Sequence, residues 1–345
     1  MRGSDSPPPL EYANGVEEGG VPESPHAGVH DVRVHLRGRY DRLAELVPRR
    51  FPTILAGDNQ SPITSGSGRL ELARWLANPS HPLTSRVIVN RIWQHHFGEG
   101  IVRTPSNFGF LGERPTNPEL LDWLTSEFVR GGSSIKRLQK LIMLSATYQQ
   151  SSKPSADALR IDPDNRLFGR MNRRRLEAEE VRDSLLAASG KLDTTMGGPA
   201  VRDFKTPRRT VYVITVRSDR TGFGPLFDMA DSTNLVDKRT ISTVAPQALF
   251  LLNDSFAIEQ ARELGRRLLA EPALDEQARI GRAYLLLFGR PALPQEVRIG
   301  QAFLAKARTS PVRKPEGGAS PNVEESAWTA YSQILLSANE FMYVD

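Results

Sequence analysis

The 345-residue sequence has no cysteine, and it has only eight lysines against 37 arginines. Without cysteine the chain forms no disulfide, thiolate zinc site, iron–sulfur cluster or covalent c-type haem, and it has no cysteine nucleophile. This absence does not fix the compartment, since many periplasmic proteins also lack disulfides. The arginine excess suits binding of phosphate, sulfate or carboxylate. Because the arginines are spread along the chain beside acidic residues, we favour an origin in a GC-rich genome.

Long apolar runs are also missing. No stretch approaches the roughly 20 apolar residues of a membrane-spanning helix, and the N-terminus shows no apolar core of a signal peptide. Hydrophobic residues nevertheless make up 39% of the chain, which is enough for one large domain or two smaller ones with real cores. We therefore expect a folded chain without a membrane span.

Residues 1–60 are predicted to form an irregular arm, because their first half is dense in Pro, Gly and acidic residues. Alternating Val32, Val34 and Leu36 predict one short strand within it. Helical patterns dominate residues 61–345, beginning with a helix over 70–76. If this region holds two subdomains, the polar stretch near 151–172 is where we expect them to divide.

The most apolar helix is predicted to begin at Thr84 and to end before Gly98. Val89, Trp93 and Phe97 recur within it at four-residue spacing, which predicts deep burial.

Two shorter helices should follow as a hairpin, interrupted by the glycines at 131 and 132. Their predicted inward residues are Leu120, Leu124 and Phe128 in the first helix, and Ile135, Leu138, Ile142 and Ala146 in the second.

The second half is predicted to contain an arginine-rich helix over 174–189 and a strand over 208–217, where apolar residues alternate with a period of two. Further helices are expected at about 255–270, 275–288, 294–308 and 323–338. These patterns indicate a mainly α, multi-helical domain with a small β-hairpin or short strands, and a helix-rich α+β fold is the alternative.

Several segments together resemble a known family. They include SGRLELARWL (67–76), RVIVNRIWQHHFGEGIVRTPSNFG (86–109), PTNPELLDWL (115–124), LSATYQQSS (144–152), RRRLEAEEVRDSLLAASG (173–190), APQALFLLN (245–253) and NEFMYVD (339–345). From about residue 60 to the last residue, the chain is similar to the C-terminal domain of unknown function in planctomycete cytochrome-c-associated proteins. The resemblance implies a large exported protein with a cytochrome-c-like part upstream. This chain has no Cys-x-x-Cys-His motif, so the resemblance implies a fragment or a shortened member.

One polar group in the apolar helix and just beyond it is a candidate ligand site. It comprises Arg86, Asn90, Arg91, His95, His96 and Arg103. Buried arginine and asparagine need polar partners, so these residues bind either an anionic ligand or the chain's own carbonyls, and we favour the second interpretation. A metal site at His95 and His96 is disfavoured, since adjacent helical residues point about 100° apart.

Carboxylates at 177, 179, 180 and 183 share helical spacing that paired acid/base chemistry could use. Interleaved arginines favour neutralising ion pairs instead. Arg173, Arg174 and Arg175 form a weak footprint for nucleic acid, because acids follow at once and no aromatic residues lie between them. No phosphate loop, dinucleotide-binding or hydrolase motif is present.

Three functions remain open. The leading hypothesis is a non-catalytic interaction or scaffold domain with protein partners in an exported, redox-associated assembly. The rival is an enzyme or binding protein acting on anionic, sulfated glycans, and nucleic-acid binding is the weakest. We expect no catalytic residue set, no metal and no cofactor, and the resemblance implies a location in the periplasm or at the cell surface.

Overall fold

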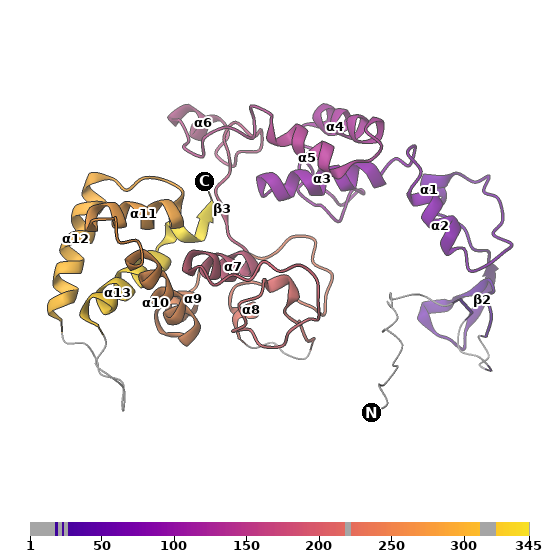
Figure 1. Ribbon diagram of the computed structural model, residues 1–345. Helices are drawn as coiled ribbons and strands as arrows, with labels where there is room; N and C mark the ends of the chain where they lie inside the picture. The colour runs from indigo at the N-terminus through magenta and orange to yellow at the C-terminus, as the bar shows by residue number, and fades with distance from the viewer. Residues whose placement is uncertain (1–17, 20–22, 24–26, 218–221, 311–321, 345) are drawn as a thin grey trace, which may run out of the picture. The chain divides into compact units, whose positions relative to one another are not determined.

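The computed structural model describes residues 18–19, 23, 27–217, 222–310 and 322–344. The chain forms two compact units, the first from Met1–Ile92 and Pro118–Gln139, the second from Trp93–Asn117 and Lys140–Asp345. Figure 1 shows the predominance of helix, with thirteen α-helices in the described part. The predicted mainly α fold is therefore confirmed, together with two small antiparallel sheets.

The first unit begins with a ribbon of β1 (Val32–His35) and β2 (Leu43–Val47), joined through a 3-10 turn (Leu36–Gly38). The predicted strand near Val32 is thus confirmed, and β2 is its partner. The helices of this unit are α1 (Thr53–Ala56), α2 (Arg69–Leu76), the start of α3 (Thr84–Phe97), α4 (Pro118–Arg130) and the start of α5 (Ile135–Met143). Its buried apolar side chains come from α3, α4 and α5, namely Val89, Ile92, Leu121, Leu124, Phe128 and Leu138.

The second unit contains the ends of α3 and α5 and the remaining elements of the chain. These are α6 (Ala156–Ile161), β3 (Arg174–Arg175), α7 (Ala178–Ser189), a 3-10 turn (Thr210–Tyr212), α8 (Phe223–Leu226), α9 (Ala245–Asn253), α10 (Ser255–Leu269), α11 (Glu276–Phe288), α12 (Pro294–Thr309), α13 (Val323–Leu336), a 3-10 turn (Asn339–Met342) and β4 (Tyr343–Val344).

Short polar side chains define where the long C-terminal helices begin. Asp254 accepts a hydrogen bond from Phe256 N at 2.8 Å before α10, and Asp275 accepts one from Ala278 N at 2.7 Å before α11. Such caps satisfy backbone donors that the first helical turn leaves free. Helix α11 then ends at Gly289, whose backbone is left-handed.

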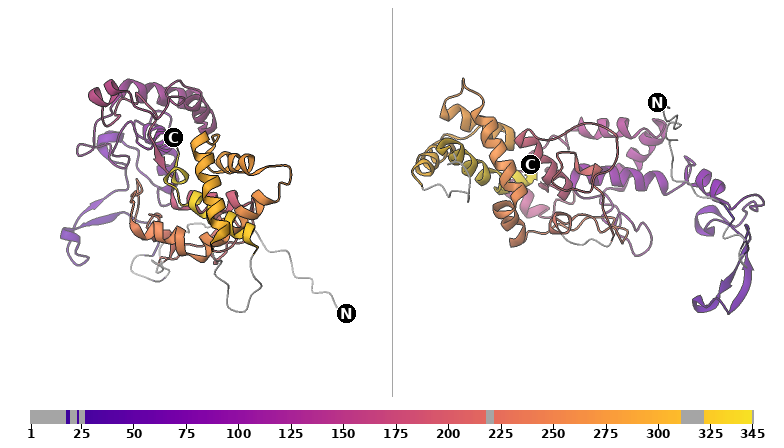
Figure 2. Two further views of the ribbon diagram at one scale, coloured as in Figure 1. Left: turned by 90° about the vertical axis from the view of Figure 1, so that its left-hand side faces the viewer. Right: turned by 60° about the horizontal axis from the view of Figure 1, so that its bottom comes forward.

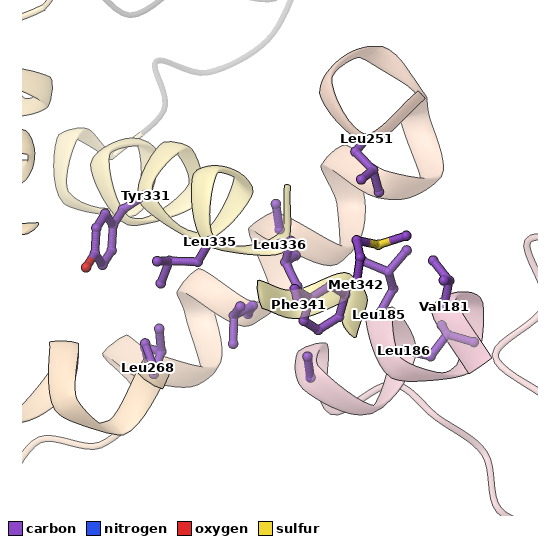
Figure 3. Close-up of a cluster of buried hydrophobic side chains, with 14 of the residues drawn as sticks. Val181, Leu185, Leu186, Leu251, Leu268, Tyr331, Leu335, Leu336, Phe341 and Met342 are labelled. Carbon is purple, nitrogen blue, oxygen red and sulfur yellow. The ribbon is translucent and has the colours of Figure 1, made fainter. Parts of the chain in front are cut away.

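The main hydrophobic core belongs to the C-terminal bundle, where α10 packs along α13 (Figure 2). Gly265 permits this close approach, since a Cβ atom there would lie 3.1 Å from the backbone of Trp328. Figure 3 shows Phe341 and Met342 between α13 and the apolar side of α7. The strand pair β3–β4 adds a backbone link, so the last residues of the described chain complete the second unit.

The structure corrects three local predictions. The arginine-rich helix starts at Ala178, because Arg174 and Arg175 instead pair with β4. The predicted strand over 208–217 is wrong as drawn: Thr210–Tyr212 forms a 3-10 turn, and only isolated bridges flank it. Among the residues predicted to be inward in these two helices, Ile135 is exposed, Ala146 is exposed and lies beyond the end of α5, and Leu121 is buried where Leu120 was expected.

The predicted irregular arm at the N-terminus lies partly outside the described residues. Within the residues that are described, each helix is too short or too polar to cross a lipid bilayer.

Candidate functional site

Arg86 of the predicted ligand group lies near the start of α3 and is engaged by its own chain. Its Nε donates to Asp122 Oδ1 on α4 at 2.8 Å, and a terminal nitrogen donates to the carbonyl of Pro82 at 2.6 Å. All three residues belong to the first unit. This guanidinium therefore links two helices within that unit.

Asn90 and Arg91 follow on α3 and point in different directions. Asn90 is completely buried, whereas the side chain of Arg91 is exposed. They do not share one surface as the sequence hypothesis requires.

The other three residues of the group belong to the second unit. His95 is exposed, and the ring of His96 meets the Tyr148 ring edge-on with 5.5 Å between centroids. Burial lowers the pKa of His96, and the neighbouring charges of His95 and Arg174 lower it further. Arg103 Nε lies 3.8 Å from a carboxylate oxygen of Glu99. The six candidates are thus divided between two units, and none of them lines the cleft described next.

A different site lies beside α7. The helix starts where it does because the Glu180 carboxylate accepts a hydrogen bond from the backbone N–H of Glu177 at 2.9 Å. Its apolar side, with Val181 and Leu185, packs into the core of the second unit. Its polar side is left to form one wall of a cavity of about 1080 Å³, which we call the α7 cleft.

Arg182 holds the segment opposite α7 in place. Its side chain is completely buried and donates to the carbonyls of Phe204 at 2.8 Å and Arg208 at 2.8 Å, and also to that of Thr206. The guanidinium lies 4.6 Å from the centre of the Phe204 ring. Burial lowers the pKa of Arg182, and the charges of Asp183 and Asp203 partly offset that effect. This one side chain therefore organises the loop over 203–210 that borders the cleft.

The α7 cleft combines charged and apolar lining. Its carboxylates are Glu177, Glu179, Glu180 and Asp183, its arginines are Arg202, Arg209 and Arg239, and its apolar residues include Phe204, Val211, Val213, Val216, Phe223 and Met229. A cavity with apolar lining and a few fixed polar groups is the usual form of a binding site.

The carboxylates of the cleft are held in ion pairs, as the sequence predicted. Glu179 binds Arg239 bidentately at 2.5 and 3.0 Å, and Arg239 also reaches Glu177 at 3.2 Å. Glu180 pairs with Arg174 at 3.1 Å. Burial alone would raise the pKa of Glu179, but the hydrogen bond and charge of Arg239, with a backbone hydrogen bond, hold it below its ordinary value.

One wall of the cleft is formed by residues 213–216, which begin with extended backbone at Val213. Ile214 N donates to Val201 O at 2.8 Å, and Val201 N donates to Tyr212 O at 2.8 Å. Beyond this bridge, Thr215 and Val216 are exposed and make no hydrogen bond to any other described residue. The period-two pattern that predicted a strand thus marks a segment whose last residues, Thr215 and Val216, have no strand partner in the part of the chain that the structure describes.

Sequence reasoning identified the carboxylates of α7 but missed the cleft around them. Arg239 lies 60 residues beyond Glu179, and no local pattern connects the two. The alternating residues of 208–217 were the available signal for the opposite wall. Within the described residues, no group of three or more His, Asp or Glu side chains is placed to hold a metal ion.

Comparison with known proteins gives one match. The family model described as PSD1, a protein of unknown function (DUF1553), matches residues 68–304, which is more than half of the chain. No curated protein and no solved structure matches it. The family is commonly found in planctomycete cytochrome-c-associated proteins, in agreement with the resemblance of the sequence segments. The chain therefore belongs to the PSD1 family of proteins of unknown function.

Proposed function

We propose that this domain is a protein-interaction module whose α7 cleft binds an extended polypeptide segment of a partner. The observation that carries the proposal is the wall formed by residues 213–216, where Thr215 and Val216 line a large cavity, are exposed and have no strand partner among the described residues. An added strand gains affinity from main-chain hydrogen bonds and specificity from pockets for alternate side chains. The cleft offers both features.

The apolar lining supports a polypeptide occupant. The side chains of Val211 and Val216 are 71% and 40% exposed at the cleft. Alternate side chains of an incoming strand would cover them, and each Å² of apolar surface removed from water contributes about 25 cal/mol. In an exported, redox-associated assembly, which the family resemblance favours, a neighbouring protein or domain would supply this strand.

The glycan hypothesis stays open but has weaker support. It requires Arg86, Asn90, Arg91, His95 and His96 to act together, whereas Arg86 already binds Asp122 and Asn90 is fully buried. The nucleic-acid hypothesis needs free cations near residue 174, yet Arg174 pairs with Glu180, and Arg175 donates to Gln247 Oε1 at 2.7 Å.

Selection from a displayed random-peptide library against the purified chain tests the proposal. Selected peptides should bind with micromolar affinity, and Val216→Pro should weaken binding at least tenfold, because proline lacks the N–H that pairs with an added strand. Val211→Lys should also weaken binding by about tenfold, a free-energy change of about 1.4 kcal/mol.

Ile299→Lys is the matched control, because Ile299 is 60% exposed on α12 and does not line the cleft. Its peptide affinity should equal that of the unaltered chain. A library that yields no binder, or selected peptides that bind Val216→Pro as tightly as the unaltered chain, would refute the proposal.

A further inference from the structure

A long loop between α8 and α9 is pinned at its base. Ser242 N donates to Asp228 Oδ2 at 2.7 Å, and the Ser242 hydroxyl donates to the same carboxylate. Residues 229–241 therefore leave the body of the second unit and return to the same place, as in an Ω-loop. We call these residues the strap.

Met229, the first residue of the strap, packs against the hydrophobic core, but the larger apolar side chains farther along the strap are exposed. Leu235 is fully exposed, Val236 is 41% exposed and Ile241 is 63% exposed. A segment that buries few apolar side chains opens locally at a low cost in free energy.

Ion pairs at two adjacent residues attach the strap to other parts of the second unit. Lys238 binds Glu99, which follows α3, and Arg239 binds Glu179 and Glu177 at α7. The ion pair of Arg239 is of a stronger type than that of Lys238, since a guanidinium can donate two parallel hydrogen bonds to one carboxylate. The hydrogen bonds that Arg239 donates to the Glu179 carboxylate also raise the pKa of Arg239.

Arg239 belongs both to the strap and to the wall of the α7 cleft. We propose that the strap is a latch on the α7 cleft, closed by Arg239 on Glu177 and Glu179, and that a partner opens it by placing a basic side chain on the same carboxylates. The second part of this inference, that a partner opens the latch, rests on the proposed function; we call it the partner half. It narrows the occupant of the α7 cleft to an extended segment that carries Arg or Lys.

Competition explains why the occupant should be basic. An uncharged segment that displaced Arg239 would leave two half-buried carboxylates without a counter-charge, which is costly. An arginine of the partner replaces one ion pair with another, so little electrostatic energy is lost. The exchange also releases the later part of the strap, where Leu235, Val236 and Ile241 have little apolar burial to lose.

Hydrogen–deuterium exchange tests the latch without any peptide. In Arg239→Ala, amides of residues 229–241 should exchange at least fivefold faster than in the unaltered chain, and Arg239→Lys should lie between the two. Raising the salt from 0.05 M to 0.5 M should speed exchange in the unaltered strap, since salt screens ion pairs, and should have less effect in Arg239→Ala. If neither the substitution nor the salt concentration changes the amide exchange rates of the strap, the inference is wrong.

Peptide binding tests the partner half. A selected peptide with one Arg should bind Arg239→Ala about tenfold more tightly than the unaltered chain, because its competitor is gone. The same peptide with norleucine in place of Arg should gain less than threefold. Glu179→Gln should weaken binding of the Arg peptide and leave the norleucine peptide nearly unchanged.

The failures can be told apart. If peptides bind at the cleft but show no preference for a basic residue, the partner half of the inference is wrong and the proposed function survives. If no peptide binds although the strap responds to salt and to Arg239→Ala, the proposed function and the partner half fail together, and the intramolecular latch survives.

Discussion

The ribbon β1–β2 and the bundle around α10 and α13 are stabilised in different ways. Every residue of β1 is exposed, whereas Leu264, Leu268 and Trp328 in the bundle are completely buried. Burial of apolar side chains therefore stabilises the bundle far more than the ribbon. An isolated two-stranded ribbon is at best marginally stable in water.

Polar side chains connect the ribbon to the chain that follows it. Arg49 binds Asp31 at 2.9 Å and the carbonyl of Ile63 at 3.1 Å, and it also binds the carbonyl of Gly66. Gln60 both donates to Phe51 O and accepts from Phe51 N. Single contacts of this kind contribute about 1 kcal/mol each. We infer that the bundle opens globally, whereas the ribbon opens locally at low cost.

The largest effect is expected in the bundle. Leu268→Ala removes a fully buried side chain and leaves a cavity, so the second unit should lose about 3 kcal/mol of its free energy of unfolding. Urea denaturation followed by circular dichroism measures this loss. Leu249→Ala on α9, where the side chain is 56% exposed, should cost less than about 0.5 kcal/mol. Equal losses in the two variants would contradict the contrast between core and surface.

A smaller effect is expected at Arg182. Arg182→Met keeps much of the side-chain volume but leaves the carbonyls of Phe204 and Arg208 without their donor, at a cost of about 2 kcal/mol. The loop over 203–210 should then loosen, so trypsin should cleave faster after Lys205.

Arg267→Met is the comparison for this variant. Arg267 donates to the carbonyls of Ala187 and Ala188 but is only partly buried, so water can replace those bonds and the loss should stay below about 1 kcal/mol. If Arg182→Met costs no more than Arg267→Met, Arg182 does not organise the wall of the cleft.

The sequence predicted the helices of the bundle well, because their limits are set locally. The side chain of Asp254 caps the N-terminus of α10, so the start of this helix is visible in the sequence. The apolar residues of each helix recur with the helical period because one side of the helix is buried. The start of α7 was misplaced because β4, almost 170 residues later, recruits Arg174 and Arg175 into a strand pair. A pairing between strands so far apart in the sequence cannot be recognised from the residues of a short segment.

The candidate site was predictable only in part. Ion pairing of the α7 carboxylates was predicted, and the pair between Arg174 and Glu180 confirms it, although Arg174 reaches Glu180 from β3 and not from the helix itself. The cleft itself depends on Arg182 binding carbonyls over 204–208 and on Arg239 reaching Glu179, contacts that separate segments bring together. Polar residues close in sequence on α3 suggested a single site, yet the structure assigns them to different units.

The smallest effect is expected in the ribbon, and it sharpens the contrast with the bundle. Arg49→Ala removes the bonds to Asp31 and to the carbonyls of Ile63 and Gly66. Because the Arg49 side chain is 25% exposed, water replaces part of what is lost, and local stability should fall by about 1 kcal/mol or less. Hydrogen exchange should accelerate a few-fold in β1 and β2 and remain unchanged in α10. Arg33→Ala, which loses one exposed bond to Ala44 O, should change exchange less than Arg49→Ala does. Faster exchange throughout α10 in Arg49→Ala would show instead that ribbon and bundle unfold as one cooperative body.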